Sequence, residues 1–259
     1  MKFLYRITGG IVVSFWSLAG LASDSWMKWS NTEVQYLHGD AFQAPYRASD
    51  ISQSIITFTH AHGWALGRNF MFMDTLITEA GQPAQTSVYG EAYSYISLGK
   101  LLGKDLAFGI FKDLNAAIGV NAGENFDSPK SGSRVVLYGA TIDFDLPGFK
   151  LFSVDFLRHN VLEPAAQGSS WQITPVWKLP FEIAGTKWSL EGFADFIGKK
   201  GPTFARTALA QPQLRLDLGD LWGRANHLYV GIEYQYWHNK YGIKGLHESL
   251  PQALVIWKF

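Results

Sequence analysis

The sequence has 259 residues, of which 15% are aromatic and only 17% are charged. Its 22 acidic and 22 basic residues give a formal net charge of zero, and no run of Lys or Arg is present to follow a phosphate backbone, which argues against binding to a nucleic-acid polymer. The chain contains no cysteine, so an exported form must fold without disulfides. A composition rich in aromatic residues and poor in charge suits contact with lipid better than contact with water.

Residues 1–22 have the pattern of a secretory signal peptide. Lys2 and Arg6 precede an apolar stretch at 11–21, and Ala22 is a small residue suited to cleavage. The stretch is about half of the ~20 residues that a transmembrane helix needs, so it predicts a cleaved signal and not an anchor. Later apolar stretches are interrupted by Gly, Pro or charge, and residues 23–259 show no linker. They are predicted to form one domain.

The mature chain divides into segments with the residue pattern of β-strands. There are twelve of them, at 31–37, 54–62, 68–78, 87–97, 112–121, 134–145, 150–159, 171–180, 187–196, 206–217, 227–237 and 249–259. Most lengths approach the ~10 residues that a tilted strand needs to cross a membrane, and closed bacterial barrels have an even number of strands. The sequence therefore predicts an all-β fold, a 12-stranded antiparallel transmembrane β-barrel of the outer-membrane type.

The connections between these segments alternate in length. The longer, mostly polar ones are 38–53, 79–86, 122–133, 160–170, 197–205 and 238–248, whereas others, such as 63–67 and 146–149, are tight. With both termini in the periplasm, the long set becomes extracellular and the short set periplasmic. Residues 98–111 are an exception, because they form a long connection on the periplasmic side.

Alternation along each strand assigns residues to the two faces of the barrel wall. At 227–237 it places Leu228, Val230, Ile232, Tyr234 and Tyr236 toward lipid and Tyr229, Gly231, Glu233, Gln235 and Trp237 toward the lumen. The same reasoning predicts further inward residues. They are Tyr89, Glu91, Tyr93 and Tyr95, then Asp143 and Asp145, then Glu191, Phe193 and Asp195, and finally Gln213, Arg215 and Asp217.

Two segments depart from this simple pattern or extend it. Asp74 shares its face with Phe70, Phe72 and Leu76, so it breaks the expected alternation unless a bulge or a position near the rim places it there. The final segment puts Ala253, Val255, Trp257 and Phe259 on one face and ends the chain on an aromatic residue. That pattern is typical of the strand that closes an outer-membrane barrel, with Trp257 and Phe259 in the aromatic girdle.

Several segments, taken in order, resemble one known family. They are Trp29, 69–74 (NFMFMD), 89–91 (YGE), 97–101 (SLGKL), 105–109 (DLAFG), 111–113 (FKD), 142–148 (IDFDLPG), 236–239 (YWHN) and the last strand. Their order and spacing resemble the Tsx-like family, the nucleoside-specific channel and OmpK outer-membrane proteins. The resemblance implies a monomeric twelve-stranded barrel with a narrow channel that passes nucleosides, and it accounts for the long connection at 98–111.

A passage for nucleosides needs rings that stack on a base and oxygen atoms that accept hydrogen bonds from hydroxyl and amino groups. The candidate substrate-binding residues in the lumen are Glu91, Tyr93, Tyr95, Asp74, Arg215, Glu233, Trp237 and His238. The alternative reading is that they fill and brace the lumen, with carboxylates paired to an arginine such as Arg215.

Two other motifs contain residues that could bind a metal or act in catalysis. His60 and His62 have a spacing that suits a metal, but no third and fourth ligand is identifiable, so they are read as histidines at the rim. His247, Glu248 and Ser249 are similar to the His-x-Ser of outer-membrane lipid hydrolases, but no placed orienting group accompanies them. We expect no catalytic residue, no metal and no cofactor.

The sequence thus favours a passive channel in the bacterial outer membrane, surrounded by lipid, for nucleosides or solutes of similar size. A first alternative is a non-conducting or weakly selective barrel that acts as a surface receptor or structural protein. A second is an enzyme acting on lipid. The sequence does not separate the channel from the receptor, because that distinction depends on the radius of the lumen.

Overall fold

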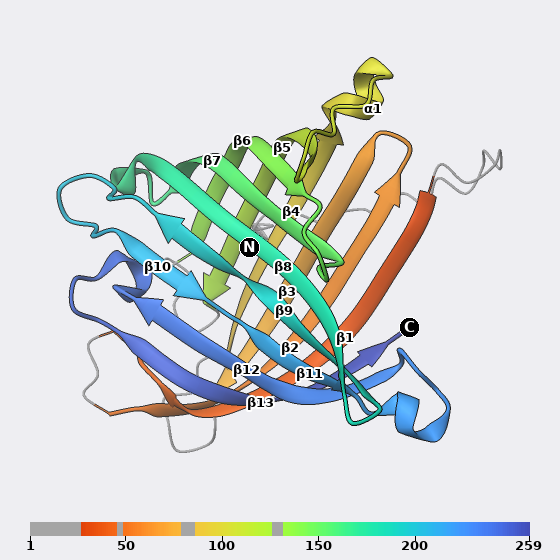
Figure 1. Cartoon of the computed structure of the whole chain (residues 1–259). Coiled ribbons are helices and arrows are strands. Elements are labelled where there is room, and N and C mark those ends of the chain that lie inside the picture. The colour runs from red at the N-terminus through yellow and green to blue at the C-terminus, as the bar shows by residue number, and fades with distance from the viewer. Residues whose placement is uncertain (1–26, 46–48, 79–85, 126–131) are drawn as a thin grey trace, which may run out of the picture.

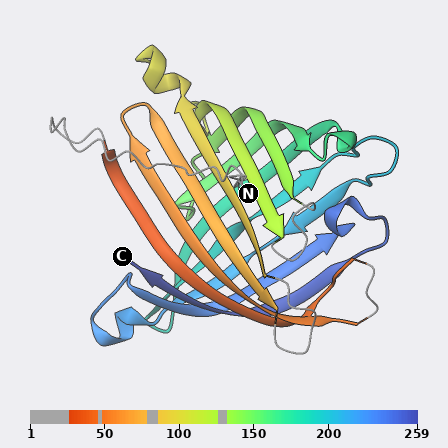
Figure 2. The same ribbon diagram turned by 180° about the vertical axis from the view of Figure 1, so that it is seen from behind.

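The computed structural model describes residues 27–45, 49–78, 86–125 and 132–259, and the predicted signal peptide lies outside these residues. The described part is a single antiparallel sheet that closes on itself (Figures 1 and 2). Its strands are β1 (Met27–Phe42), β2 (Ile51–Trp64), β3 (Gly67–Thr78), β4 (Thr86–Ser97), β5 (Phe111–Asn125), β6 (Ser133–Phe144), β7 (Leu151–Glu163), β8 (Ser169–Ile183), β9 (Thr186–Ile197), β10 (Thr207–Ala210), β11 (Gln213–Asp217), β12 (Leu228–His238) and β13 (Glu248–Lys258). The helical elements are α1 (Leu98–Leu102), η1 (Ala165–Gln167), η2 (Gly219–Trp222) and η3 (Lys240–Gly242).

The wall of the barrel has twelve strands, because β10 and β11 are two halves of one. Both halves pair with β9 on one side and with β12 on the other. The interruption lies at Gln211 and Pro212, where the proline has no N–H to donate to the ladder. Pairing of β1 with β13, and of β13 with β12, closes the cylinder and leaves no open edge. The predicted 12-stranded barrel is confirmed.

Most strands are longer than their predicted segments. β1, for example, covers Met27–Phe42 where alternation marked only 31–37. The alternating sequence pattern appears only in the part of a strand that has lipid on one face. The backbone hydrogen bonds between strands continue beyond that part, into the polar ends of the barrel. Among the described residues, no helix is both long and apolar enough to cross a membrane.

Both termini of the barrel lie at one end, where β1 begins and β13 ends. The turn between β2 and β3, the connection from β4 to β5 with α1, and the connection with η2 are at this same end, with α1 standing out beyond the neighbouring strands (Figure 1). In bacterial barrels this is the periplasmic end. The predicted long connection at 98–111 is thus a short helix, an irregular segment and a tight turn at Gly109, which a bridge between Phe108 and Phe111 closes.

Side chains alternate between a buried interior and an exposed exterior. In β13, successive residues from Glu248 to Lys258 are alternately buried and exposed. Ala253, Val255 and Trp257 are on the exposed face, and Phe259 continues it. On the outer wall at the periplasmic end, aromatic rings pack side by side. Phe111 and Phe144 have ring centroids 5.3 Å apart, and Phe144 and Phe152 5.8 Å apart. Such rings form the girdle expected where hydrocarbon meets head groups.

The structure corrects two predicted faces. Asp74 causes no break, because β3 pairs with both neighbours in continuous register and the whole face of Phe70, Phe72, Asp74 and Leu76 points inward. Met73 and Ile77, on the other face, are exposed to the membrane. Asp74 therefore lies in the lumen as predicted, without the bulge or the position near the rim that were considered for it. Asp145 was predicted to face the lumen with Asp143, but β6 ends at Phe144 and Asp145 is exposed in the turn that follows.

Candidate functional site: the barrel lumen

Two apolar clusters line opposite parts of the interior. The first joins β1, β2 and β13 through residues that include Leu37, Ile55, Leu254 and Ile256. The second joins β4 to β7 and includes Tyr93, Tyr95, Leu137 and Leu157. Both sets occupy inward positions, so the lumen is partly filled by packed side chains, as in other narrow barrels.

An aromatic row runs along the inner faces of β3 and β4. The rings of Phe70 and Phe72 are 6.1 Å apart, those of Phe72 and Tyr89 6.0 Å, and those of Tyr93 and Tyr95 6.1 Å with nearly parallel planes. The sequence analysis missed Phe70 and Phe72, because apolar residues that alternate with Met71 and Met73 were expected to face lipid. The lumen therefore has more rings than alternation indicated.

Glu91 lies in this row with its carboxylate already engaged. Its Oε1 accepts hydrogen bonds from the Tyr89 hydroxyl at 2.5 Å and from Asn121 Nδ2 at 2.9 Å. The Tyr93 hydroxyl in turn donates to Asn121 Oδ1 at 3.3 Å. Tyr89 and Glu91 are only partly buried, whereas Tyr93 is buried. Glu91 is thus held in a fixed position at a place where part of the lumen wall remains accessible.

Asp74 is also positioned by a neighbour on the wall. The Thr57 hydroxyl donates to Asp74 Oδ1 at 2.6 Å, and the ladder places Asp74 directly beside Tyr89. Carboxylates from the other side of the barrel interact electrostatically with this group: Asp195 with Glu91, and Glu233 with Asp74. An acidic zone therefore crosses the lumen next to the aromatic row.

Tyr95 takes part in a bracing network nearer the periplasmic end. Its hydroxyl donates to Asp155 Oδ2 at 3.1 Å, and the guanidinium of Arg68 lies 4.6 Å from the centre of its ring. Arg68 also donates two hydrogen bonds of 2.7 Å to the two oxygens of Asp143. This bidentate pair spans from β3 to β6 and fixes Tyr95 in the wall. Tyr95 is buried, which fits the bracing reading of this residue.

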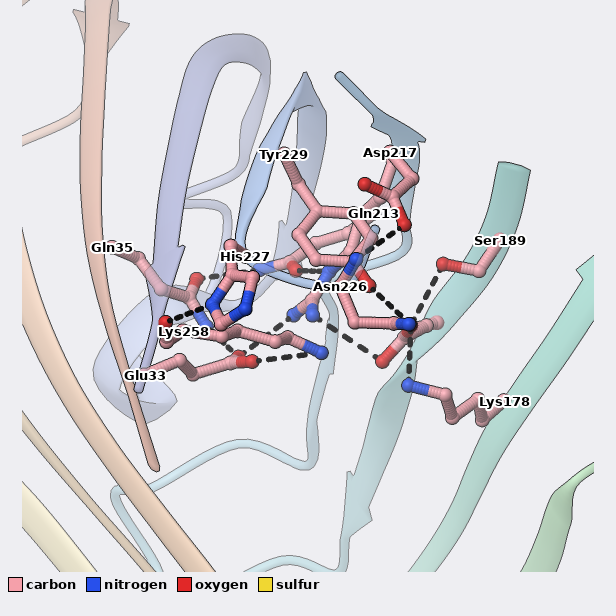
Figure 3. Close-up of polar contacts among 12 residues, drawn as sticks. Glu33, Gln35, Lys178, Ser189, Gln213, Asp217, Asn226, His227, Tyr229 and Lys258 are labelled. Atoms are coloured by element: carbon pink, nitrogen blue, oxygen red, sulfur yellow. Dashed lines mark hydrogen bonds and ion pairs between the residues drawn. The ribbon is translucent and has the colours of Figure 1, made fainter. Parts of the chain in front are cut away.

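Arg215 is the centre of a second network on the opposite side of the barrel. Figure 3 shows members of this network, among them Glu33, Lys178, Gln213 and Lys258. Its guanidinium lies 3.3 Å from both Glu33 and Glu191, and its Nε donates to Gln213 Oε1 at 2.7 Å. Lys258 approaches Glu33 at 3.3 Å, and Lys178 approaches Glu191 at 2.7 Å. The geometry supports the bracing role for Arg215, because all of its described contacts are with wall residues.

Glu233 belongs to a polar track along β11, β12 and β13. It accepts hydrogen bonds from Gln213 at 2.6 Å, Gln211 at 3.1 Å and Gln252 at 2.9 Å. From there the track continues through Gln235 to Glu248, whose other oxygen accepts from Lys240 Nζ at 2.5 Å. Polar side chains are thus linked from the Arg215 network to the extracellular end.

Trp237 and His238 lie at that extracellular end but on opposite faces. The indole of Trp237 donates to Thr207 Oγ1 at 3.0 Å and packs edge-on against Tyr241 at 4.8 Å. His238 is the next residue on the strand, and its ring stacks on that of His247 with centroids 4.5 Å apart. The predicted placement of His238 in the lumen is wrong, because strand alternation turns it away from Trp237.

The connection from β9 to β10 folds a lysine against the wall. Lys200 Nζ lies 3.0 Å from His159 Nε2, and burial lowers the pKa of Lys200 to about 8. His159 in turn contacts Gln172, which donates to the carboxylate of Asp195 at 3.0 Å. A side chain from an extracellular loop is therefore connected to the acidic zone.

The two histidine motifs have no lumen role in the structure. His60 and His62 lie on the outer face of β2 with Nε2 and Nδ1 3.2 Å apart, and no group of three or more His, Cys, Asp or Glu suited to a metal occurs among the described residues. His247 Nδ1 accepts from the backbone N–H of Asn239, while Ser249 Oγ bonds to the Tyr234 hydroxyl at 2.6 Å. These contacts engage His247 and Ser249 with different partners.

Comparison with solved structures returns porins and an autotransporter transport unit, all at low identity. A KdgM porin is 7% identical over 89% of this chain and 99% of its own, with a TM-score of 0.47. A Rhodopseudomonas blastica porin, a triple mutant, is 8% identical over 89% and 99%, with a TM-score of 0.35. The transport unit of the autotransporter AIDA-I from Escherichia coli is 7% identical over 94% of each chain, with a TM-score of 0.32.

No curated protein matches the chain. A family profile described as "Nucleoside-specific channel-forming protein, Tsx" matches residues 25–252, which is far more than half of the sequence and covers every strand from β1 to β12 and the first part of β13. Together with the closed twelve-stranded barrel, this match establishes an outer-membrane location. The chain belongs to the Tsx family of channel-forming proteins of the outer membrane.

Proposed function

We propose that this outer-membrane channel passes nucleosides, or neutral solutes of similar size and shape, by passive diffusion. The observation that carries the proposal is the pairing of an aromatic row with carboxylates at the accessible part of the lumen. Phe72, Asp74, Tyr89 and Glu91 lie next to one another on β3 and β4 and are only partly buried.

The chemistry of these groups suits a nucleoside. A flat base gains from stacking on rings such as Phe72 and Tyr89, while the carboxylate oxygens of Asp74 and Glu91 accept hydrogen bonds from ribose hydroxyls or a base amine. The carboxylates from the facing wall, Asp195 and Glu233, make the zone acidic, which favours a neutral solute over an anion. Selective passage requires contacts that admit the solute and still release it.

Uptake into proteoliposomes tests the proposal. Entry of labelled uridine should exceed entry into protein-free liposomes, and unlabelled uridine should compete where ribose at the same concentration does not. Phe72→Leu should weaken this competition, whereas Phe58→Leu, which changes a phenylalanine on the outer face of β2, should leave it unchanged. Equal competition by ribose and uridine would refute the role of the aromatic row.

The alternative of a non-conducting barrel is favoured by one observation. Many inward polar side chains are inaccessible to water, with Gln252 fully buried and Arg215 only 6% exposed. A lumen packed in this way along its whole length would serve a receptor or structural role. Uridine entry no faster than in protein-free liposomes would support that reading.

A further inference from the structure

The connection at 98–111, which joins β4 to β5 at the periplasmic end, carries large apolar side chains on its surface. Leu101, Leu102, Phe108 and Ile110 are 55%, 60%, 83% and 51% exposed, respectively. α1 stands out beyond the neighbouring strands (Figure 1), and every residue from 100 to 112 is exposed. A contiguous apolar patch of this kind marks a surface that contacts a membrane or another protein.

Hydrogen bonds fix the shape of this surface. The hydroxyl of Ser97 caps α1 by accepting from the N–H of Lys100 at 3.0 Å, and it donates to the carboxylate of Asp113 on β5. Asp113 Oδ1 also accepts from the N–H of Gly99 at 3.3 Å, and the N–H of Lys104 donates to the carbonyl of Gly99 at 2.9 Å. α1 is therefore tied to the start of β5, and its exposed leucines belong to a defined surface.

Phe108 continues the lipid-facing wall of the barrel. Around the turn at Gly109, the backbones of Phe108 and Phe111 exchange two hydrogen bonds of 2.9 Å. Side chains that lie directly opposite each other in an antiparallel pair point to the same face. The ring of Phe111 packs against Phe144 in the girdle of the outer wall, with centroids 5.3 Å apart. The aromatic girdle thus extends past the end of β4 to Phe108, and the apolar patch is continuous with the surface that contacts lipid.

The same connection is basic. Residues 98–112 contain three lysines, Lys100, Lys104 and Lys112, and one acidic residue, Asp105. Lysine side chains at the membrane boundary attract lipid phosphate groups, while apolar side chains enter the boundary between head groups and acyl chains. Continuity with the lipid-facing wall and positive charge together favour phospholipid over a periplasmic protein as the partner of this surface.

We propose that the connection at 98–111 is an interfacial anchor that inserts into the inner leaflet of the outer membrane. Phe108 and Ile110 enter the boundary between head groups and acyl chains beside the girdle, and Lys100 and Lys104 meet lipid phosphates. The anchor holds the β4 and β5 side of the barrel at a fixed depth. The proposal depends on the outer-membrane location and not on the solute that the lumen passes.

Quenching of a fluorescent label tests the anchor. Because the sequence has no cysteine, Phe108→Cys and Ile110→Cys each introduce a single thiol for labelling, and either position is sufficient if the other variant does not fold. Val255→Cys, on the lipid-facing side of β13, is the lipid reference. Lys244→Cys, exposed in the loop before β13, is the water reference. Each labelled barrel is reconstituted into phospholipid vesicles at less than one barrel per vesicle, and heat-modifiable migration on gels verifies its fold.

Nitroxide-labelled phospholipid should quench the labels at 108 and 110 at least about threefold more strongly than the label at 244, and nearly as strongly as the label at 255. Iodide, added on both sides of the membrane, should show the reverse order. Two results would overturn the proposal. Iodide quenching at 108 and 110 that equals the quenching at 244 would place the surface in water, as a docking face for a periplasmic protein. Protection from iodide only when many barrels share a vesicle would assign the surface to a second copy of the chain.

Discussion

Replacing Arg215 with methionine should destabilise the barrel without changing its fold. Arg215 holds Glu33 and Glu191, which approach its guanidinium at 3.3 Å from different strands. The side chain of Arg215 is 7% exposed and that of Glu33 is 4% exposed, so water does not replace the lost contacts. Methionine keeps much of the volume, and the variant therefore tests the charge in the network.

The expected loss follows from this burial. Removing one partner of a buried ion pair costs about 3–5 kcal/mol, because the remaining charge is left uncompensated. Lys258 still approaches Glu33 and Lys178 still approaches Glu191, which reduces the penalty. We therefore expect the lower end, about 3 kcal/mol in the free energy of unfolding, which corresponds to roughly a hundredfold in the unfolding equilibrium.

Guanidinium unfolding of the purified barrel in lipid bilayers, followed by tryptophan emission, measures this loss. The control is Arg134→Met, because Arg134 pairs with Glu163 at 3.1 Å with both side chains more than half exposed. An exposed pair contributes about 0–1 kcal/mol. Equal destabilisation by the two substitutions would refute the reasoning, since it would mean that the lumen around Arg215 is as well hydrated as the surface.

Three further predictions follow from the wall, the last strand and the loop lysine. Met73→Lys should lower the free energy of unfolding by about 2–4 kcal/mol because Met73 faces lipid, whereas Asp74→Leu should lower it by less. A larger loss for Asp74→Leu than for Met73→Lys would contradict the inward orientation of Asp74 on β3. Deleting Phe259 should lower the amount of folded, heat-modifiable protein in the outer membrane more than it lowers synthesis, because the terminal strand closes the barrel, and an unchanged folded fraction would count against this. The pKa of Lys200 is lowered to about 8, so the folded protein binds fewer protons than the unfolded chain between that pH and the ordinary lysine pKa of 10.5. The free energy of unfolding of the parent should therefore rise relative to that of Lys200→Met as pH increases through that window. If the two proteins instead show parallel pH profiles of unfolding free energy, Lys200 is hydrated in the folded state.

Alternation predicted the twelve strands and most of their inward faces, because lipid imposes a strong apolar requirement on one side of each strand. It failed at β3 for a physical reason. An apolar side chain is compatible with either face in a barrel whose lumen is lined by rings, so Phe70 and Phe72 carried no information about direction. The exposed neighbours Met73 and Ile77 were equally apolar. Asp74 was the informative residue on that strand, and its charge correctly marks the lumen.

The contacts inside the lumen were beyond the reach of the sequence. Arg68 meets Asp143 from a strand three positions along the sheet, and Arg215 on β11 meets Glu33 on β1. Which residues meet depends on the curvature of the closed wall and on the reach of long side chains, and neither is encoded in a local pattern. Pairing of Arg215 with carboxylates was foreseen as a type of interaction, but its partners were not. His238 was misplaced because membership in a matched segment does not define a face.

The central claim is that the aromatic and acidic zone of the lumen binds nucleosides as they pass. The most direct test is the ion current through single barrels in planar bilayers, with and without added adenosine. Adenosine should block the parent current, and Glu91→Gln, which keeps the volume but replaces the carboxyl group that Tyr89 and Asn121 hold in place, should reduce the block while the barrel remains folded. A parent current that adenosine does not change would contradict the account and favour the receptor reading.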